Sequence, residues 1–149
     1  QYDVQVYASA SQAVKDADII CTATSSTEPL IYLRDLSPSV HINAVGSHNK
    51  MMQEIGTDIL SKGIVIADQL EAVLAESGEI MRAVEQKQLA PSSILEIGSW
   101  LTHKNQDYTE QLTLFKSVGL AIQDLSVANV VYQNALKNHL GVNYAIHDV

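Results

Sequence analysis

Short apolar runs that alternate with stretches of helical periodicity are the feature that most constrains how this 149-residue chain folds. Ile64-Val-Ile-Ala67 is apolar at every position, and Asp18-Ile-Ile-Cys-Thr-Ala-Thr24 is apolar and β-branched before it meets a polar cluster. Strands of this composition are typical of parallel sheets, whose strands are buried on both faces. Because helical patterns separate the runs, the sequence predicts an α/β fold, a parallel sheet flanked by helices.

The same reading places the remaining elements along the chain. Ser9 or Ser11 is expected to cap the first helix, and Asp68 to cap the helix that follows residues 64–67. Further strands are predicted at residues 3–7, 41–45 and 112–115, a helical turn at 34–36, and helices at 10–17, 51–60, 70–76, 79–88 and 118–138. Residues 93–100 fit more than one pattern, and 104–111 are expected to form an exposed polar loop.

The long helix predicted at the C-terminal end is apolar on two sides. One stripe contains Val118, Ala121, Ile122, Leu125, Ala128, Tyr132, Ala135 and Leu136. A second stripe contains Leu120, Val127, Val130 and Val131. A helix of this kind is either deeply buried or bridges to another domain or subunit, so we expect a homo-oligomer.

Composition excludes several classes of function. The net charge of −8 repels phosphate groups, so neither nucleic acid nor an anionic membrane surface is an expected partner. No apolar run is long enough to span a bilayer. The single cysteine, Cys21, excludes an internal disulfide framework and is expected to be a small buried apolar residue, which favours a cytoplasmic location.

Three predicted strands end in hydroxyl groups or glycine, and these ends are expected to meet. They are Ile20-Cys-Thr-Ala-Thr24, His41-Ile-Asn-Ala-Val-Gly46 and Thr113-Leu-Phe-Lys-Ser-Val-Gly119. Ligands of open parallel sheets bind in the crevice at the carboxyl ends of the strands. The pattern therefore predicts a nucleotide-binding crevice there.

These stretches, with Glu54, Asp124 and Tyr132 at matching positions, resemble the ornithine cyclodeaminase/mu-crystallin family. The likeness covers nearly the whole chain but only the later part of a family member, and the chain begins at Gln1 without a methionine. The resemblance implies a single incomplete Rossmann-like NAD(P)-binding domain over residues 1–149, with a partial parallel sheet and a long C-terminal helix. It also implies NAD or NADP as cofactor, a small amino or imino acid as substrate, and dimerisation through a separate domain.

The resemblance also implies roles for individual residues. Thr24 would contact the cofactor; Val45, Gly46 and Ser47 would line its nicotinamide side; Ser117 would reach it from the last strand; and Val118 would border the substrate. Each has a simpler alternative: Ser117 could cap a helix, Thr24 could end a strand, and Gly46 could permit a tight turn.

Two departures from the family pattern bear on activity. The phosphate-binding turn G-x-G-x-x-G needs two glycines one residue apart, and no two of the seven glycines have that spacing. His48 stands where cyclodeaminases of the family carry a catalytic aspartate. A histidine could move a proton near neutral pH, or it could be a solvated loop residue.

Other polar residues are assigned no chemistry. Glu71, Glu76 and Glu79 are expected to be solvated charges near helix ends, and the histidines show no spacing typical of a metal site. Two hypotheses remain. The chain is the cofactor-binding part of an NAD(P)-dependent cyclodeaminase or amino-acid dehydrogenase, inactive alone, or it is a non-enzymatic α/β scaffold that self-associates or binds a partner.

Overall fold

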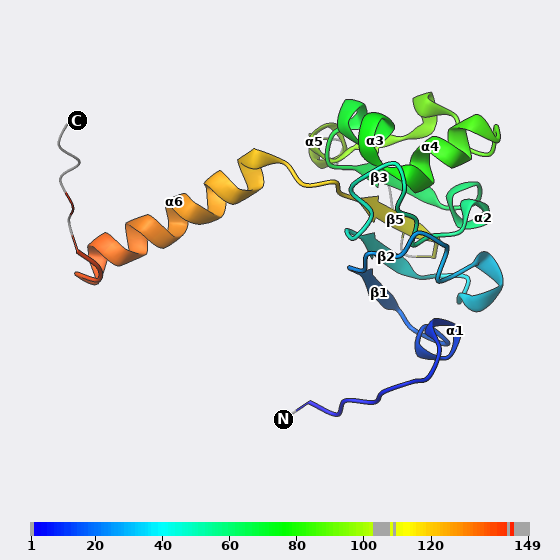
Figure 1. Ribbon diagram of the computed structural model, residues 1–149, viewed down its shortest axis with the longest axis horizontal. Coiled ribbons are helices and arrows are strands. Elements are labelled where there is room, and N and C mark those ends of the chain that lie inside the picture. The colour runs from blue at the N-terminus through cyan, green and yellow to red at the C-terminus, as the bar shows by residue number, and fades with distance from the viewer. Residues whose placement is uncertain (1, 103–107, 109, 143, 145–149) are drawn as a thin grey trace. The chain divides into compact units, whose positions relative to one another are not determined.

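A five-stranded parallel sheet organises residues 1–119, the first of two units into which the chain divides (Figure 1). The computed structural model describes residues 2–102, 108, 110–142 and 144. In chain order the elements are α1 (Ala10–Ala13), β1 (Ile19–Thr22), η1 (Leu33–Asp35), β2 (His41–Ala44), α2 (Thr57–Leu60), β3 (Ile64–Ala67), α3 (Leu70–Glu76), α4 (Gly78–Glu85), η2 (Pro91–Ser93), β4 (Leu95–Glu96), α5 (Ile97–Thr102), β5 (Thr113–Lys116) and α6 (Ala121–Lys137).

The strand order is β1-β2-β5-β3-β4, and every pairing is parallel. In register, Thr22 lies beside Ala44, Ala44 beside Lys116, and Lys116 beside Ala67. The carboxyl ends of four strands therefore form one edge, as the predicted α/β fold requires. That fold, a Rossmann-like parallel sheet with flanking helices and a long C-terminal helix, is confirmed.

One face of the sheet is the floor of the hydrophobic core. Ile20, Ile42, Leu114 and Val65 are aligned across neighbouring strands and are all buried. The helices α2, α3 and α4 lie together beside the sheet, and their apolar residues complete the core (Figure 1). Burial of this continuous apolar layer is the main force that holds the unit together.

The other face of the sheet is less covered than the apolar runs predict. Ile19 is 67% exposed, and His41, Asn43, Thr113 and Phe115 are only partly buried. Cys21, which was expected to be buried, is exposed on this face, because successive strand residues point to opposite sides. Its environment is that of a surface thiol.

The strand predicted at residues 3–7 is wrong. Val4 and Val6 are 78% and 92% exposed, and the segment has no regular structure. An alternating pattern becomes a strand only where it pairs with a neighbouring strand, and among the described residues no strand pairs with this segment; the outer side of β1 stays unpaired.

The helix predicted at residues 51–60 is helical only in its last turn, α2. Residues 52–56 are buried, and their backbone groups bond to a different segment: Gln53 N donates to Ser26 O at 2.9 Å, and Glu54 O accepts from Leu30 N at 2.8 Å. Apolar spacing alone did not distinguish this buried extended segment from a helix.

Of the two predicted helix caps, the one at α1 is confirmed and the one at α3 is wrong. Ser9 caps α1 as expected, through a bond from Gln12 N, whereas Ser11 bonds Asp35. Asp68 does not cap α3, whose N-cap is Gln69; the Leu70 amide is satisfied by Glu96 instead. The ambiguous residues 93–100 contain the end of η2, β4 and the start of α5, and most of the loop predicted at 104–111 lies outside the described residues.

The second unit, residues 120–149, contains α6, a helix of 17 residues with no buried side chain. Most residues of both apolar stripes are exposed, with Leu125, Val127 and Val131 each more than 60% exposed, whereas Val118 lies before α6 and packs partly against the core of the first unit. In the part of the chain that is described, no helix is both long and apolar enough to cross a membrane.

Candidate site at the carboxyl ends of the strands

The loops that leave β1, β2 and β5 start from adjacent strands at one edge of the sheet. They carry Thr24, then Val45 to Ser47, then Ser117 and Val118. The fold thus brings all of the predicted cofactor residues to the same edge. This is where open parallel sheets bind ligands.

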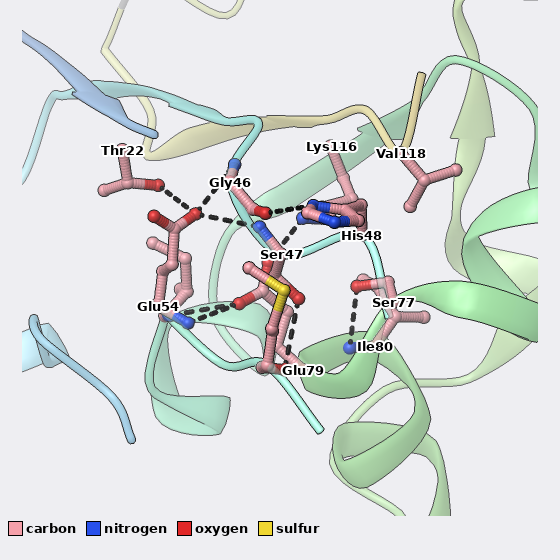
Figure 2. A network of polar contacts seen from close by, with 12 residues as sticks. Thr22, Gly46, Ser47, His48, Glu54, Ser77, Glu79, Ile80, Lys116 and Val118 are labelled. Atoms are coloured by element: carbon pink, nitrogen blue, oxygen red, sulfur yellow. Dashed lines mark hydrogen bonds and ion pairs between the residues drawn. The ribbon is translucent and has the colours of Figure 1, made fainter. Parts of the chain in front are cut away.

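A buried carboxylate, Glu54, joins the first two of these loops (Figure 2). Its Oε1 accepts a hydrogen bond from Thr24 N at 2.5 Å. Its Oε2 accepts from Thr22 Oγ1 at 3.0 Å, Gly46 N at 2.9 Å and Ser47 N at 3.2 Å. Four donors from two loops therefore converge on one side chain.

The environment of Glu54 favours its charged form. Burial by itself raises the pKa of this carboxyl, but the hydrogen bonds that it accepts outweigh burial and hold its pKa below the ordinary value. The loops consequently surround a fixed negative charge at neutral pH.

Gly46 is needed for space, and not for an unusual backbone angle. A Cβ at this position would overlap the Glu54 carboxylate and the backbone of Thr24. Its φ is not among the positive values of the chain. Gly46 is therefore required by the close approach of two loops, and not by the tight turn that was the simpler alternative.

A second buried carboxylate, Glu79, lies beneath this arrangement. Its Oε2 accepts from the backbone N–H groups of Glu54 and Ile55 at 2.9 and 3.1 Å (Figure 2). Its Oε1 lies 2.8 Å from Nζ of Lys116, and both side chains are almost fully buried. The expectation that Glu79 is solvated is wrong, because the first turn of α4 points into the core.

Ser117 and Val118 are held by a third carboxylate, Asp68, at the end of β3. The Ser117 hydroxyl donates to Asp68 Oδ2 at 2.7 Å, and Val118 N donates to the same oxygen at 3.2 Å. Ser117 Oγ also accepts from Gly119 N at 3.2 Å. Ser117 is not the N-cap of α6, which is Leu120.

Three predicted residues offer exposed surface at this edge: Thr24, Val45 and His48. Ser47 differs, because it is fully buried and its hydroxyl donates to Met52 O at 3.1 Å. The Nδ1 atom of His48 lies 2.8 Å from Gly46 O. A carbonyl oxygen only accepts, so Nδ1 carries the proton and Nε2 is the acceptor of the neutral ring.

Sequence reasoning missed the three carboxylates that organise the site. Glu54 was noted as part of the motif but given no role, Glu79 was assigned to solvent, and Asp68 to a helix cap. A lysine in an otherwise apolar strand, Lys116, was the available signal, since a buried lysine requires an acidic partner.

The arrangement fits part of a dinucleotide site. Exposed Thr24, Val45 and His48 border the strand ends, and the loops beneath them are fixed by Glu54. The sequence has no Gly-x-Gly turn to let backbone approach a pyrophosphate. No cluster of His, Cys, Asp or Glu suited to a metal ion occurs among the residues that the structure describes.

Comparisons with known proteins find relatives that match most of this chain. Ketimine reductase mu-crystallin of Rattus norvegicus is 35% identical over 135 residues, which are 90% of this chain and 41% of that protein. The structure of Thermococcus litoralis Δ1-pyrroline-2-carboxylate reductase, in complex with NADH and L-proline, has a TM-score of 0.84 and 32% identity, covering 91% of this chain and 43% of that one.

An archaeal alanine dehydrogenase dimer with bound NAD has a TM-score of 0.81 and 33% identity, over 93% of this chain and 43% of that chain. The chain spans about two fifths of the length of the curated relatives it matches. Residues 1–139 of the 149 match the model of one family. The chain belongs to the ornithine cyclodeaminase/mu-crystallin family.

Proposed function

We propose that this chain supplies the nicotinamide side of an NAD(P)H site in a protein that interconverts imines and amines beside a carboxylate. The observation that carries the proposal is the meeting of the β1, β2 and β5 ends at one edge, with two of their loops joined by Glu54. The names of the relatives support the substrate class, since a ketimine and a pyrroline carboxylate are both imines.

Within this proposal the exposed residues have different tasks from the buried ones. Thr24 and Val45 would contact the nicotinamide, and Val118 would border the substrate. Gly46, Ser47 and Ser117 would shape the site, because their polar groups are already engaged by Glu54, Met52 and Asp68. A bound reduced nicotinamide would supply the hydride that converts a C=N bond to an amine.

The amine nitrogen must also gain a proton, and His48 is the candidate donor. Its ring is exposed, and its Nδ1 bond to Gly46 O leaves Nε2 to exchange the proton. A histidine at this position favours a reductase over a cyclodeaminase, whose aspartate it replaces in the family pattern.

The test is a titration of this chain with NADH and with NADPH, followed by nucleotide fluorescence and by ¹H–¹⁵N spectra. We expect saturable binding, weaker than micromolar because the pyrophosphate turn is missing, with shifts at Thr24, Val45 and His48. We expect no oxidation of NADH when Δ1-pyrroline-2-carboxylate is added. Absence of any shift at millimolar nucleotide would contradict the proposal.

A second candidate function is self-association through α6, with or without nucleotide binding. The helix exposes apolar residues on two sides, and one solved relative is described as a dimer. A helix that leaves so much apolar surface exposed to water gains stability when a second apolar surface covers it. Sedimentation of the chain over a range of concentrations tests this function separately.

A further inference from the structure

The four donors that meet Glu54 come from segments that are separate in the chain, residues 22–24 and 46–47. Beside these bonds, Gly46 lies close to the backbone of Thr24, and Val45 N donates to Thr22 O at 3.0 Å. The side chain of Glu54 therefore bridges the loops that follow β1 and β2 (Figure 2).

Only a carboxylate satisfies this arrangement. Both of its oxygens are acceptors, whereas an amide of the same shape presents one oxygen and one NH₂ donor. If glutamine stood at position 54, its oxygen could serve Gly46, Ser47 and Thr22, and its NH₂ group would then face the N–H of Thr24. The loop after β1 would lose its anchor.

The charge of Glu54 is not balanced by a cation in the described part of the chain, where the one ion pair joins Lys116 to Glu79. Backbone and hydroxyl dipoles stabilise it instead. Glu79 holds the backbone N–H of Glu54 at 2.9 Å and is paired with Lys116 at the end of β5. The position of Glu54 is thereby tied to all three strand ends of the candidate site.

We propose that Glu54 is a positioning residue: it holds the loops of Thr24 and of Gly46-Ser47 in the one arrangement that receives the nicotinamide. The expected effect of Glu54 on NADH binding rests on the proposed function. The arrangement of the loops themselves is measurable without nucleotide.

The experiment compares the wild-type chain with Glu54→Gln by ¹H–¹⁵N spectra and amide hydrogen exchange, first alone and then with NADH. We expect the Thr24 amide to lose its exchange protection and its downfield shift, more than Gly46 does, and NADH affinity to fall at least about tenfold. Glu71→Gln, which changes an exposed carboxylate, is the matched control and leaves both readouts unchanged.

Two further variants separate positioning from general loss of stability. Val73→Ala opens the buried core under α3 and is expected to lower stability without moving the Thr24 amide or the NADH affinity. Thr22→Val removes a single donor from Glu54 and serves if Glu54→Gln does not fold. It is expected to shift the Gly46 and Ser47 amides and to weaken NADH binding by a few fold.

The outcomes distinguish the two proposals. The positioning role is overturned if the wild type binds NADH and the Glu54→Gln variant binds it equally well. The same holds for Thr22→Val where that variant is used in its place. If the Thr24 amide stays protected in Glu54→Gln, the bridging of the loops is overturned, whatever the nucleotide does. If Glu54→Gln changes the amide signals of the loops but the wild type binds no NADH, the proposed function fails while the bridging of the loops stands.

Discussion

At the scale of single residues, Gly46 shows how little space separates the two loops. An alanine Cβ there would overlap Glu54 and Thr24, so one of the loops must move. We expect Gly46→Ala to lower the free energy of unfolding by about 1–3 kcal/mol and to weaken NADH binding. Urea denaturation and nucleotide titration measure the two effects.

Gly98 provides the matched control for that substitution. It lies in α5, and a Cβ there would meet no atom within 4 Å. Gly98→Ala should leave NADH binding unchanged and raise stability by up to about 1 kcal/mol, because alanine favours the helix. Equal losses in both variants would show that Gly46 is not a point of close approach.

The lowered pKa of Glu54 gives stability a defined dependence on pH. Its folded-state pKa lies below the ordinary value of 4.5, so the charged form stabilises the fold above that pH. We expect Glu54→Gln to cost about 1.5–3 kcal/mol at pH 7. The difference should shrink as the pH falls below 4.5 and vanish as it passes through the folded-state pKa. Urea unfolding of both proteins at several pH values measures it; a difference that grows in acid would contradict the assignment.

At the scale of elements, the pair of Lys116 and Glu79 joins β5 to the first turn of α4. Lys116→Met leaves the buried Glu79 carboxylate without its cation, and we expect a loss of about 3–5 kcal/mol. Lys116→Met combined with Glu79→Gln removes both charges and should be less destabilised than the sum of the single variants. Chemical denaturation of the four proteins gives the coupling, and simple additivity would show that the pair contributes no specific interaction.

The elements that sequence predicted best are those whose signal is local. The runs at 19–22 and 64–67 are apolar or β-branched over their whole length, and each became a strand. The strand predicted at 3–7 and the helix predicted over 51–56 are wrong, because the structure of these residues depends on partners distant in the chain. The same holds for the site. The hydroxyls and glycines at strand ends could be found from the sequence, but the roles of buried Glu79 and half-buried Asp68 follow from packing that no local pattern encodes.

At the scale of the whole molecule, the chain combines the strand ends where we propose that a nicotinamide binds with a helix that is exposed within its own unit. The residues proposed to face the nicotinamide belong to the first unit, and α6 belongs to the second. Nucleotide binding and association are therefore expected to be independent of each other, and variants of α6 can test this.

Val127 and Val131 lie one turn apart on the second apolar stripe of α6, and both are more than 60% exposed. If this stripe contacts a second copy, Val127→Lys with Val131→Lys places two like charges in the interface and shifts the chain toward monomer. Ser126→Lys with Gln133→Lys adds the same charge on the polar side of the helix and is the matched control. Sedimentation velocity should show a lower association state for the first variant only, with NADH binding equal in both. A wild-type chain that stays monomeric at high concentration would overturn self-association through α6.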